Sequence, residues 1–101
     1  MPEPPPPPPE MPAGLALVRQ TPEFNDRTTP AGLRRAHRVA AGVWGRLRVL
    51  EGAVRFVFED EPATSHDLGA GATIVIPPDV AHRVEPAAGC RFVVEFHAPP
   101  A

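Results

Sequence analysis

The chain has 101 residues, a net charge of −2 and a single cysteine, Cys90. This length suffices for one small domain and is too short for two, and a lone cysteine excludes an internal disulfide or a cysteine-based zinc cluster. The near-neutral charge disfavours nucleic acid and anionic membranes as partners. No apolar run reaches the ~18–20 residues that span a bilayer, and no secretory signal opens the chain. We therefore expect a cytoplasmic protein.

Residues 1–12 form a proline-rich arm, in which eight positions are proline. Proline has no backbone N–H to donate, so the arm is predicted to be extended and disordered, and we interpret it as a solubilising tail. The folded domain then covers residues 13–101. A domain of this size buries only about 60–65% of its unfolded surface, which favours association, and we expect a homodimer.

The first half of the domain has the pattern of short strands. Residues 15–19 predict an edge strand, and residues 21–30 a loop rich in Thr, Pro, Asn and Asp. Over residues 43–49, apolar positions alternate with Trp44 and two arginines, which is typical of a half-buried strand. A turn at Glu51–Gly52 leads to a second strand over 54–58, and we expect these two strands to pair as a hairpin.

The second half continues in the same way. An acidic loop is predicted over residues 59–67, and short strands over 73–76, 82–85 and 92–96, the first two ended by prolines. No long stretch has the helical period, although a turn of helix would fit within residues 30–39. Short strands at roughly ten-residue spacing indicate an antiparallel sandwich or barrel.

The most specific local pattern lies between Gly71 and His82. Its spacing resembles the second cupin motif, Gly-x5-Pro-x-Gly-x2-His-x3-Asn, with Asp79 in place of the second glycine and Pro86 in place of the asparagine. Asp accepts the dihedral angles of a tight turn better than most residues. In the motif, a strand, a turn and a second strand direct the histidine into a barrel, and the resemblance implies this position for His82.

The first cupin motif is present only in part. Anchored on Gly52, it puts Gly45 where the motif has a glutamate ligand and Val39 where it has a histidine, with His37 displaced by one residue from the other histidine. His37 and His82 are therefore the candidate ligands of a divalent metal ion such as Zn, Fe, Mn or Ni.

A stable metal site needs three or four ligands, and two histidines leave it incomplete. Glu85, Glu95 or His97 would complete the set if the last strand turned that face inward. The opposite face, with Phe92, Val94 and Phe96, is the better candidate for the core.

A wider pattern extends over residues 21–96. It consists of Pro30-Ala31-Gly32-Leu33, Gly42-Val43-Trp44-Gly45-Arg46-Leu47, Val49-Leu50-Glu51-Gly52 and His82-Arg83-Val84-Glu85. Together these segments resemble the TehB/YeaR-like domain family, which occurs at the N-terminus of the tellurite-resistance methyltransferase TehB and as short stand-alone proteins. The resemblance implies an all-β, small single-domain cupin-like antiparallel β-barrel (jelly roll). No S-adenosylmethionine-binding glycine motif is present, so we expect no methyltransferase activity.

The resemblance also directs attention to His37, Trp44, His82, Glu85 and Glu95 as site residues. Trp44 could line a ligand pocket or pack at an interface between subunits. Arg46 shares the strand face of Trp44 and suits an oxyanion. The resulting hypothesis is a module that binds a small molecule, an oxyanion or a metal in tellurite-type stress resistance. The alternative is a metal-dependent cupin enzyme, of oxygenase or isomerase type, with His37 and His82 as ligands.

Overall fold

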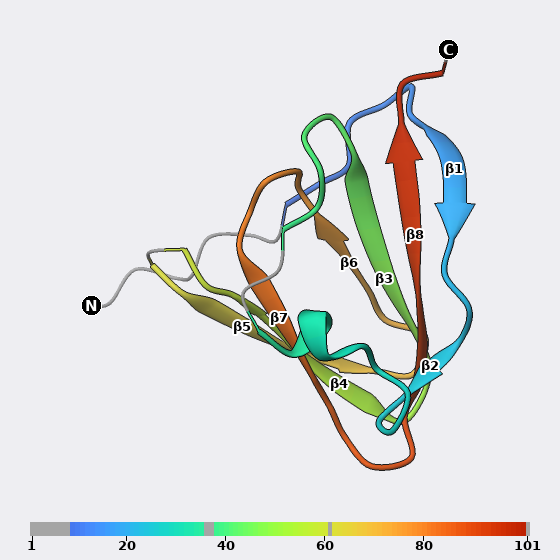
Figure 1. Ribbon diagram of the computed structural model, residues 1–101, viewed down its shortest axis with the longest axis vertical. Coiled ribbons are helices and arrows are strands. Elements are labelled where there is room, and N and C mark those ends of the chain that lie inside the picture. Colours follow the sequence, from blue (N-terminus) through green and yellow to red (C-terminus); the bar gives the residue numbers. More distant parts are fainter. Residues whose placement is uncertain (1–8, 36–37, 61, 101) are drawn as a thin grey trace.

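The computed structural model describes residues 9–35, 38–60 and 62–100, and its strands form two antiparallel sheets (Figure 1). The elements in chain order are β1 (Ala16–Gln20), β2 (Phe24–Asn25), the 3₁₀ turn η1 (Ala31–Arg34), β3 (Trp44–Glu51), β4 (Ala53–Phe58), β5 (Thr64–Gly69), β6 (Thr73–Ile76), β7 (His82–Pro86) and β8 (Arg91–Ala98). The larger sheet has the order β1-β8-β3-β6, with β2 also paired to β8, and the smaller sheet has the order β5-β4-β7.

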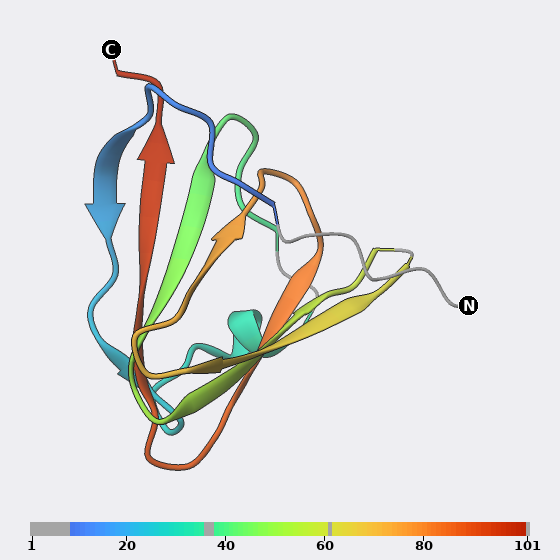
Figure 2. The same ribbon diagram turned by 180° about the vertical axis from the view of Figure 1, so that it is seen from behind.

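The two sheets meet at one end and spread apart toward the other, with η1 between them (Figures 1 and 2). This all-β arrangement is the one predicted, and η1 lies within residues 30–39, where the sequence allows a turn of helix. Within the described part of the chain, there is no helix of the length and apolar character needed to cross a membrane. Most of the predicted proline-rich arm, residues 1–8, lies outside the described residues, so the boundary between arm and domain stays a prediction.

The core fills the space between the sheets and follows the predicted alternation. Leu47 and Val49 of β3 face inward and are buried, and so are Phe92 and Val94 of β8. Apolar side chains at alternate positions share one face of a strand, and burying that face supplies most of the stabilisation of such a sheet. The inward face of β8 is therefore the one that carries Phe92 and Val94, and Glu95 has the opposite parity.

The predicted hairpin at Gly52 is wrong. β3 pairs with β6 and β8, whereas β4 pairs with β5 and β7, so the chain passes from one sheet to the other at this point. Gly52 has a φ of +73°, and a Cβ atom there would lie 2.9 Å from the Cα of Cys90. An Asp/Glu-Gly turn signal is local and does not distinguish a hairpin from a corner between sheets, because the partner strands lie elsewhere in the chain.

The predicted acidic loop is also too long. Its second half forms β5, which pairs with β4 in the register Arg55↔Asp67 and Phe56↔His66. The guanidinium of Arg55 donates to the carboxylate of Asp67 over 2.9 Å on the solvent face. β5 lies at the edge of its sheet and consists mostly of polar residues, so it lacks the apolar alternation that would have indicated a strand.

Candidate functional site

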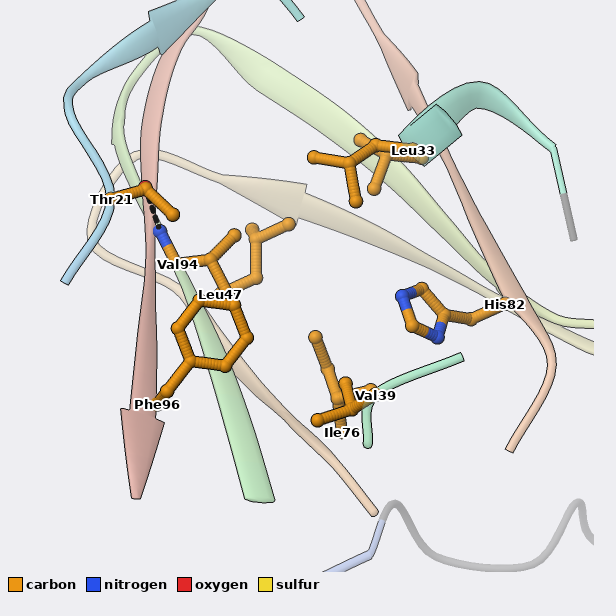
Figure 3. Close-up of a pocket in the computed structure, with 9 residues that line it drawn as sticks. Thr21, Leu33, Val39, Leu47, Ile76, His82, Val94 and Phe96 are labelled. Atoms are coloured by element: carbon orange, nitrogen blue, oxygen red, sulfur yellow. Dashed lines mark hydrogen bonds between the residues drawn. The ribbon is translucent and has the colours of Figure 1, made fainter. Parts of the chain in front are cut away.

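A small cavity of about 30 Å3 lies between the sheets beside η1 (Figure 3). Its wall is built from seven apolar side chains together with Thr21 and His82, and it includes Leu33 of η1, Leu47 of β3 and Val94 of β8. A water molecule needs roughly 10–15 Å3 of such volume, so the cavity holds about two water-sized groups. An enclosure of this size and polarity suits a very small ligand or the end of a larger one.

His82 is the polar centre of this cavity. It begins β7, is 1% exposed, and directs its ring toward the cavity (Figure 3). The ring stacks on Phe56, with a centroid distance of 5.2 Å and an interplanar angle of 18°. Its Nδ1 lies 3.1 Å from the carbonyl oxygen of Val80. Because a carbonyl can only accept, this contact assigns the proton to Nδ1 and fixes the ring orientation.

The turn that precedes β7 sets the position of His82. Asp79 has a φ of +59°, the left-handed conformation for which the cupin motif uses glycine. The N–H of Asp79 donates to the carbonyl of Val39 over 3.0 Å. The guanidinium of Arg38 donates to the carbonyl of Asp79 over 2.7 Å. These bonds tie the turn to the segment that carries Val39, so His82 and Val39 enter the cavity together.

The predicted metal ligands are not assembled by the described residues. His37 lies outside them. Val39, at the second histidine position, is 6% exposed and contributes apolar wall. At the glutamate position, the space beside Gly45 is taken by Ile76, whose Cβ and Cδ1 would lie 3.3 Å from an added Cβ.

Among residues 9–35, 38–60 and 62–100, no three His, Cys, Asp or Glu residues are grouped so that they could hold a metal ion. Of the described residues in the cavity wall, His82 alone offers a group that commonly ligates zinc or iron. One such ligand does not make a metal site. The described residues therefore do not fit the divalent ion that the cupin resemblance implies.

Three of the predicted pocket residues, Trp44, Arg46 and Glu95, lie on the outer face of the larger sheet. Trp44 and Arg46 alternate with inward-facing residues of β3, and Arg46 pairs with Glu95 in the strand register. Glu95 accepts from the guanidinium of Arg48 over 3.4 Å and lies 3.4 Å from Nε2 of His97. These residues do not line the cavity of His82, so a ligand role for Trp44, Arg46 or Glu95 stays a prediction for a separate surface.

Glu85 is placed elsewhere again. It belongs to β7 in the smaller sheet, where its carboxylate accepts from the guanidinium of Arg83 over 2.9 Å. Arg83 also donates to Glu59 over 2.7 Å. The cluster is partly exposed, and its charges are paired, as on a solvated sheet face. The structure therefore does not bring Glu85 together with His82 or with Trp44.

Sequence reasoning missed Thr21 and Arg19 as residues of the cavity region. Thr21 closes one side of the cavity, where its Oγ1 accepts from the N–H of Val94 over 3.0 Å (Figure 3). Arg19 lies with its guanidinium carbon 5.0 Å from the centre of the Phe96 ring. The register of β1 on β8 shifts between Leu17 and Arg19, and this irregularity turns Arg19 toward Phe96. The alternation of residues 15–19 carries no sign of that shift.

Cys90 is a structural residue. It is 0% exposed, and burial raises the pKa of its thiol above the ordinary value, with a further contribution from Asp26. Reactive cysteines need a lowered pKa and access to solvent. A redox role for Cys90 is therefore not supported by its surroundings.

Comparisons with known proteins identify the family and agree with the fold. The model of the TehB-like domain family matches residues 19–94. The Escherichia coli K12 protein YeaR is 33% identical over 84 residues, which cover 75% of this chain and 71% of YeaR. A crystal structure of a protein from the same strain superimposes with a TM-score of 0.81 at 28% identity, covering 91% of this chain and 98% of that one.

The crystal structure of TehB from Haemophilus influenzae is also similar, with a TM-score of 0.79 and 24% identity. The match covers 86% of this chain and 32% of TehB, so the chain spans about a third of that protein. KdgF from Halomonas sp., with a TM-score of 0.53 and 19% identity over 91% of this chain and 86% of its own, shares the fold alone. The fold is cupin-like, formed by two sheets in the described residues.

Proposed function

Since the chain belongs to the TehB-like domain family, we propose that it is a non-enzymatic module that binds a small, largely apolar molecule beside His82. The observation that carries this proposal is the small apolar cavity with a single buried imidazole in its wall. Ligand pockets commonly combine an apolar lining with a few polar groups that fix orientation. In this cavity, His82 and Thr21 are the polar groups that would orient a ligand.

Binding accounts for the cavity better than catalysis does. A catalytic site needs several groups in defined roles around one reacting atom. The described wall offers one titratable group, His82, and otherwise apolar side chains and a threonine. The activity of TehB is not transferred, because the similarity covers only about a third of that protein, and this module is proposed to act without methyl transfer.

The oxyanion and metal forms of the proposal receive less support from this cavity. Burying an unpaired charge among apolar side chains is costly, and the described donor set falls short of a metal site. We therefore favour a neutral or apolar group as the part of the ligand that enters the cavity. The family resemblance supports a link to tellurite-type stress resistance as the setting in which this binding would act.

Thermal unfolding with a small neutral probe tests the proposal. A ligand at about ten times its Kd stabilises the folded state by about 1.4 kcal/mol, which raises the Tm of a domain of this size by about 6–11 °C. We expect 1-butanol to produce a saturable shift of this kind. The matched control is Val39→Ile, whose extra methylene group reduces the space in the cavity and should prevent binding there. Any general effect of alcohol on stability is the same in this variant. Equal shifts in both proteins would contradict binding in the cavity.

Metal analysis tests the competing form of the proposal. We expect the purified protein and the His82→Ala variant to contain the same sub-stoichiometric amount of divalent metal. About one metal ion per chain in the natural protein, lost in His82→Ala, would instead favour a metal centre. A second variant, His37→Ala, would then show whether the residue outside the described ranges completes that centre.

A further inference from the structure

An open groove adjoins the cavity on the side of β1 and η1. It has a volume of about 220 Å3 and includes Arg19, Phe24 and Pro30 in its walls. Thr21, Leu33 and Phe96 line both the groove and the cavity. Because these three side chains belong to both walls, the groove lies directly against the cavity of His82.

Arg19 is the one charged side chain among the described residues that line this groove. It is exposed, and within the described residues it forms no ion pair or side-chain hydrogen bond. Its guanidinium rests over the ring of Phe96, 5.0 Å from the ring centre to the guanidinium carbon. This cation–π contact holds the positive charge of the exposed Arg19 side chain beside Phe96, which lines both groove and cavity, and a guanidinium in this position can still donate from its N–H groups to a ligand.

We propose that the cavity and the groove together bind a short-chain carboxylic acid, with its carboxylate on Arg19 and its hydrocarbon end in the cavity. This inference rests on the proposed function and names the ligand class of the same site. An ionised carboxylate is costly to bury in the apolar cavity, whereas a guanidinium offers it two parallel N–H donors. The orientation of the ligand is therefore decided by charge.

The dimensions limit the length of the acid. The cavity, at about 30 Å3, accepts about two water-sized groups, so the buried end has roughly two or three carbon atoms by the same measure. The groove, at about 220 Å3, accommodates the carboxylate and its water. A four-carbon acid such as butyrate satisfies both limits, and 1-butanol is its neutral counterpart.

Titrations of the full chain with butyrate and with 1-butanol test this inference, with binding followed by calorimetry or by NMR chemical shifts. The informative variant is Arg19→Met, which keeps a long apolar side chain over Phe96 and removes the charge. Arg27→Met is the matched control, because Arg27 is exposed and lies outside both hollows. We expect about tenfold weaker butyrate binding in Arg19→Met, unchanged 1-butanol binding, and natural affinities for both probes in Arg27→Met.

The possible results separate this inference from the proposed function. If Arg19→Met binds butyrate as tightly as the natural protein, or loses both probes equally, the role of Arg19 is overturned. Binding of 1-butanol that Val39→Ile abolishes would still support the cavity as a binding site in that case. If neither probe binds the natural protein, both the inference and the proposed function fail. Arg19→Gln serves as a second variant should Arg19→Met fold poorly.

Discussion

The corner at Gly52 offers a sharp test of the two-sheet architecture. Replacing Gly52 with alanine has two consequences. A residue with a side chain must then adopt the left-handed φ of +73°. Its new Cβ also lies 2.9 Å from the Cα of Cys90. Carbon atoms normally approach to about 3.5–4.0 Å, so a backbone must move by roughly half an ångström.

The two contributions can be separated by a matched variant. Gly71 has a φ of +87°, and no atom lies within 4 Å of an added Cβ, so Gly71→Ala reports the backbone penalty alone. That penalty is about 1–2 kcal/mol, partly offset by the lower entropy of the unfolded chain. Overpacking against a backbone atom adds about 1–3 kcal/mol. We therefore expect Gly52→Ala to cost about 2–4 kcal/mol and Gly71→Ala about 1 kcal/mol.

Urea unfolding followed by tryptophan fluorescence measures these differences, because Trp44 is the only tryptophan in the chain and is partly buried in β3. Each kcal/mol corresponds to about 4–8 °C of Tm in a domain of this size, so thermal unfolding supplies a second reading. Free energies of unfolding that agree within about 0.5 kcal/mol for the two variants, the range of an uneventful surface change, would refute the close approach between Gly52 and Cys90.

Three further predictions concern residues around the site and the corner. Asp79→Asn should leave stability within about 0.5 kcal/mol, whereas Asp79→Val should cost about 1–2 kcal/mol, because a branched side chain resists a φ of +59°; equal urea midpoints would contradict this. Phe56→Ala should cost about 3–5 kcal/mol in calorimetric unfolding and release the ring of His82, and a cost below 1 kcal/mol would argue against their stacking. For Cys90, the folded state favours the neutral thiol, since burial raises its pKa above 9.0; stability should fall as the pH rises past that value, and Cys90→Ala should remove this part of the alkaline loss.

Much of the fold could be read from the sequence because strand formation in this chain depends on local alternation. The strand over residues 73–76 and the strand beginning at His82 appear as predicted. The pairing of strands was predicted less well. Whether Gly52 closes a hairpin or passes to another sheet depends on β5, β7 and β8, which lie far along the chain. No local pattern contains that information.

The candidate site was likewise predicted only in part, because some of its features depend on residues far apart in the sequence. The position of His82 follows from a spacing of strand, turn and strand, and Asp79 supplies the left-handed residue that the turn needs. The wall of the cavity is assembled from separate segments that include Thr21 and Leu33. Arg19 reaches Phe96 only through the register shift in β1. The expected homodimer and the cytoplasmic location stay predictions.

Methyl NMR with site-specific assignments gives the most direct view of whether the cavity beside His82 binds a small molecule. Leu47, Ile76 and Val84 each present side-chain methyl groups in the cavity wall. Titration with 1-butanol is expected to shift these methyl signals saturably, with one common Kd, and to leave them unshifted in Val39→Ile. Signals that do not respond, or that respond equally in both proteins, would contradict binding at this cavity.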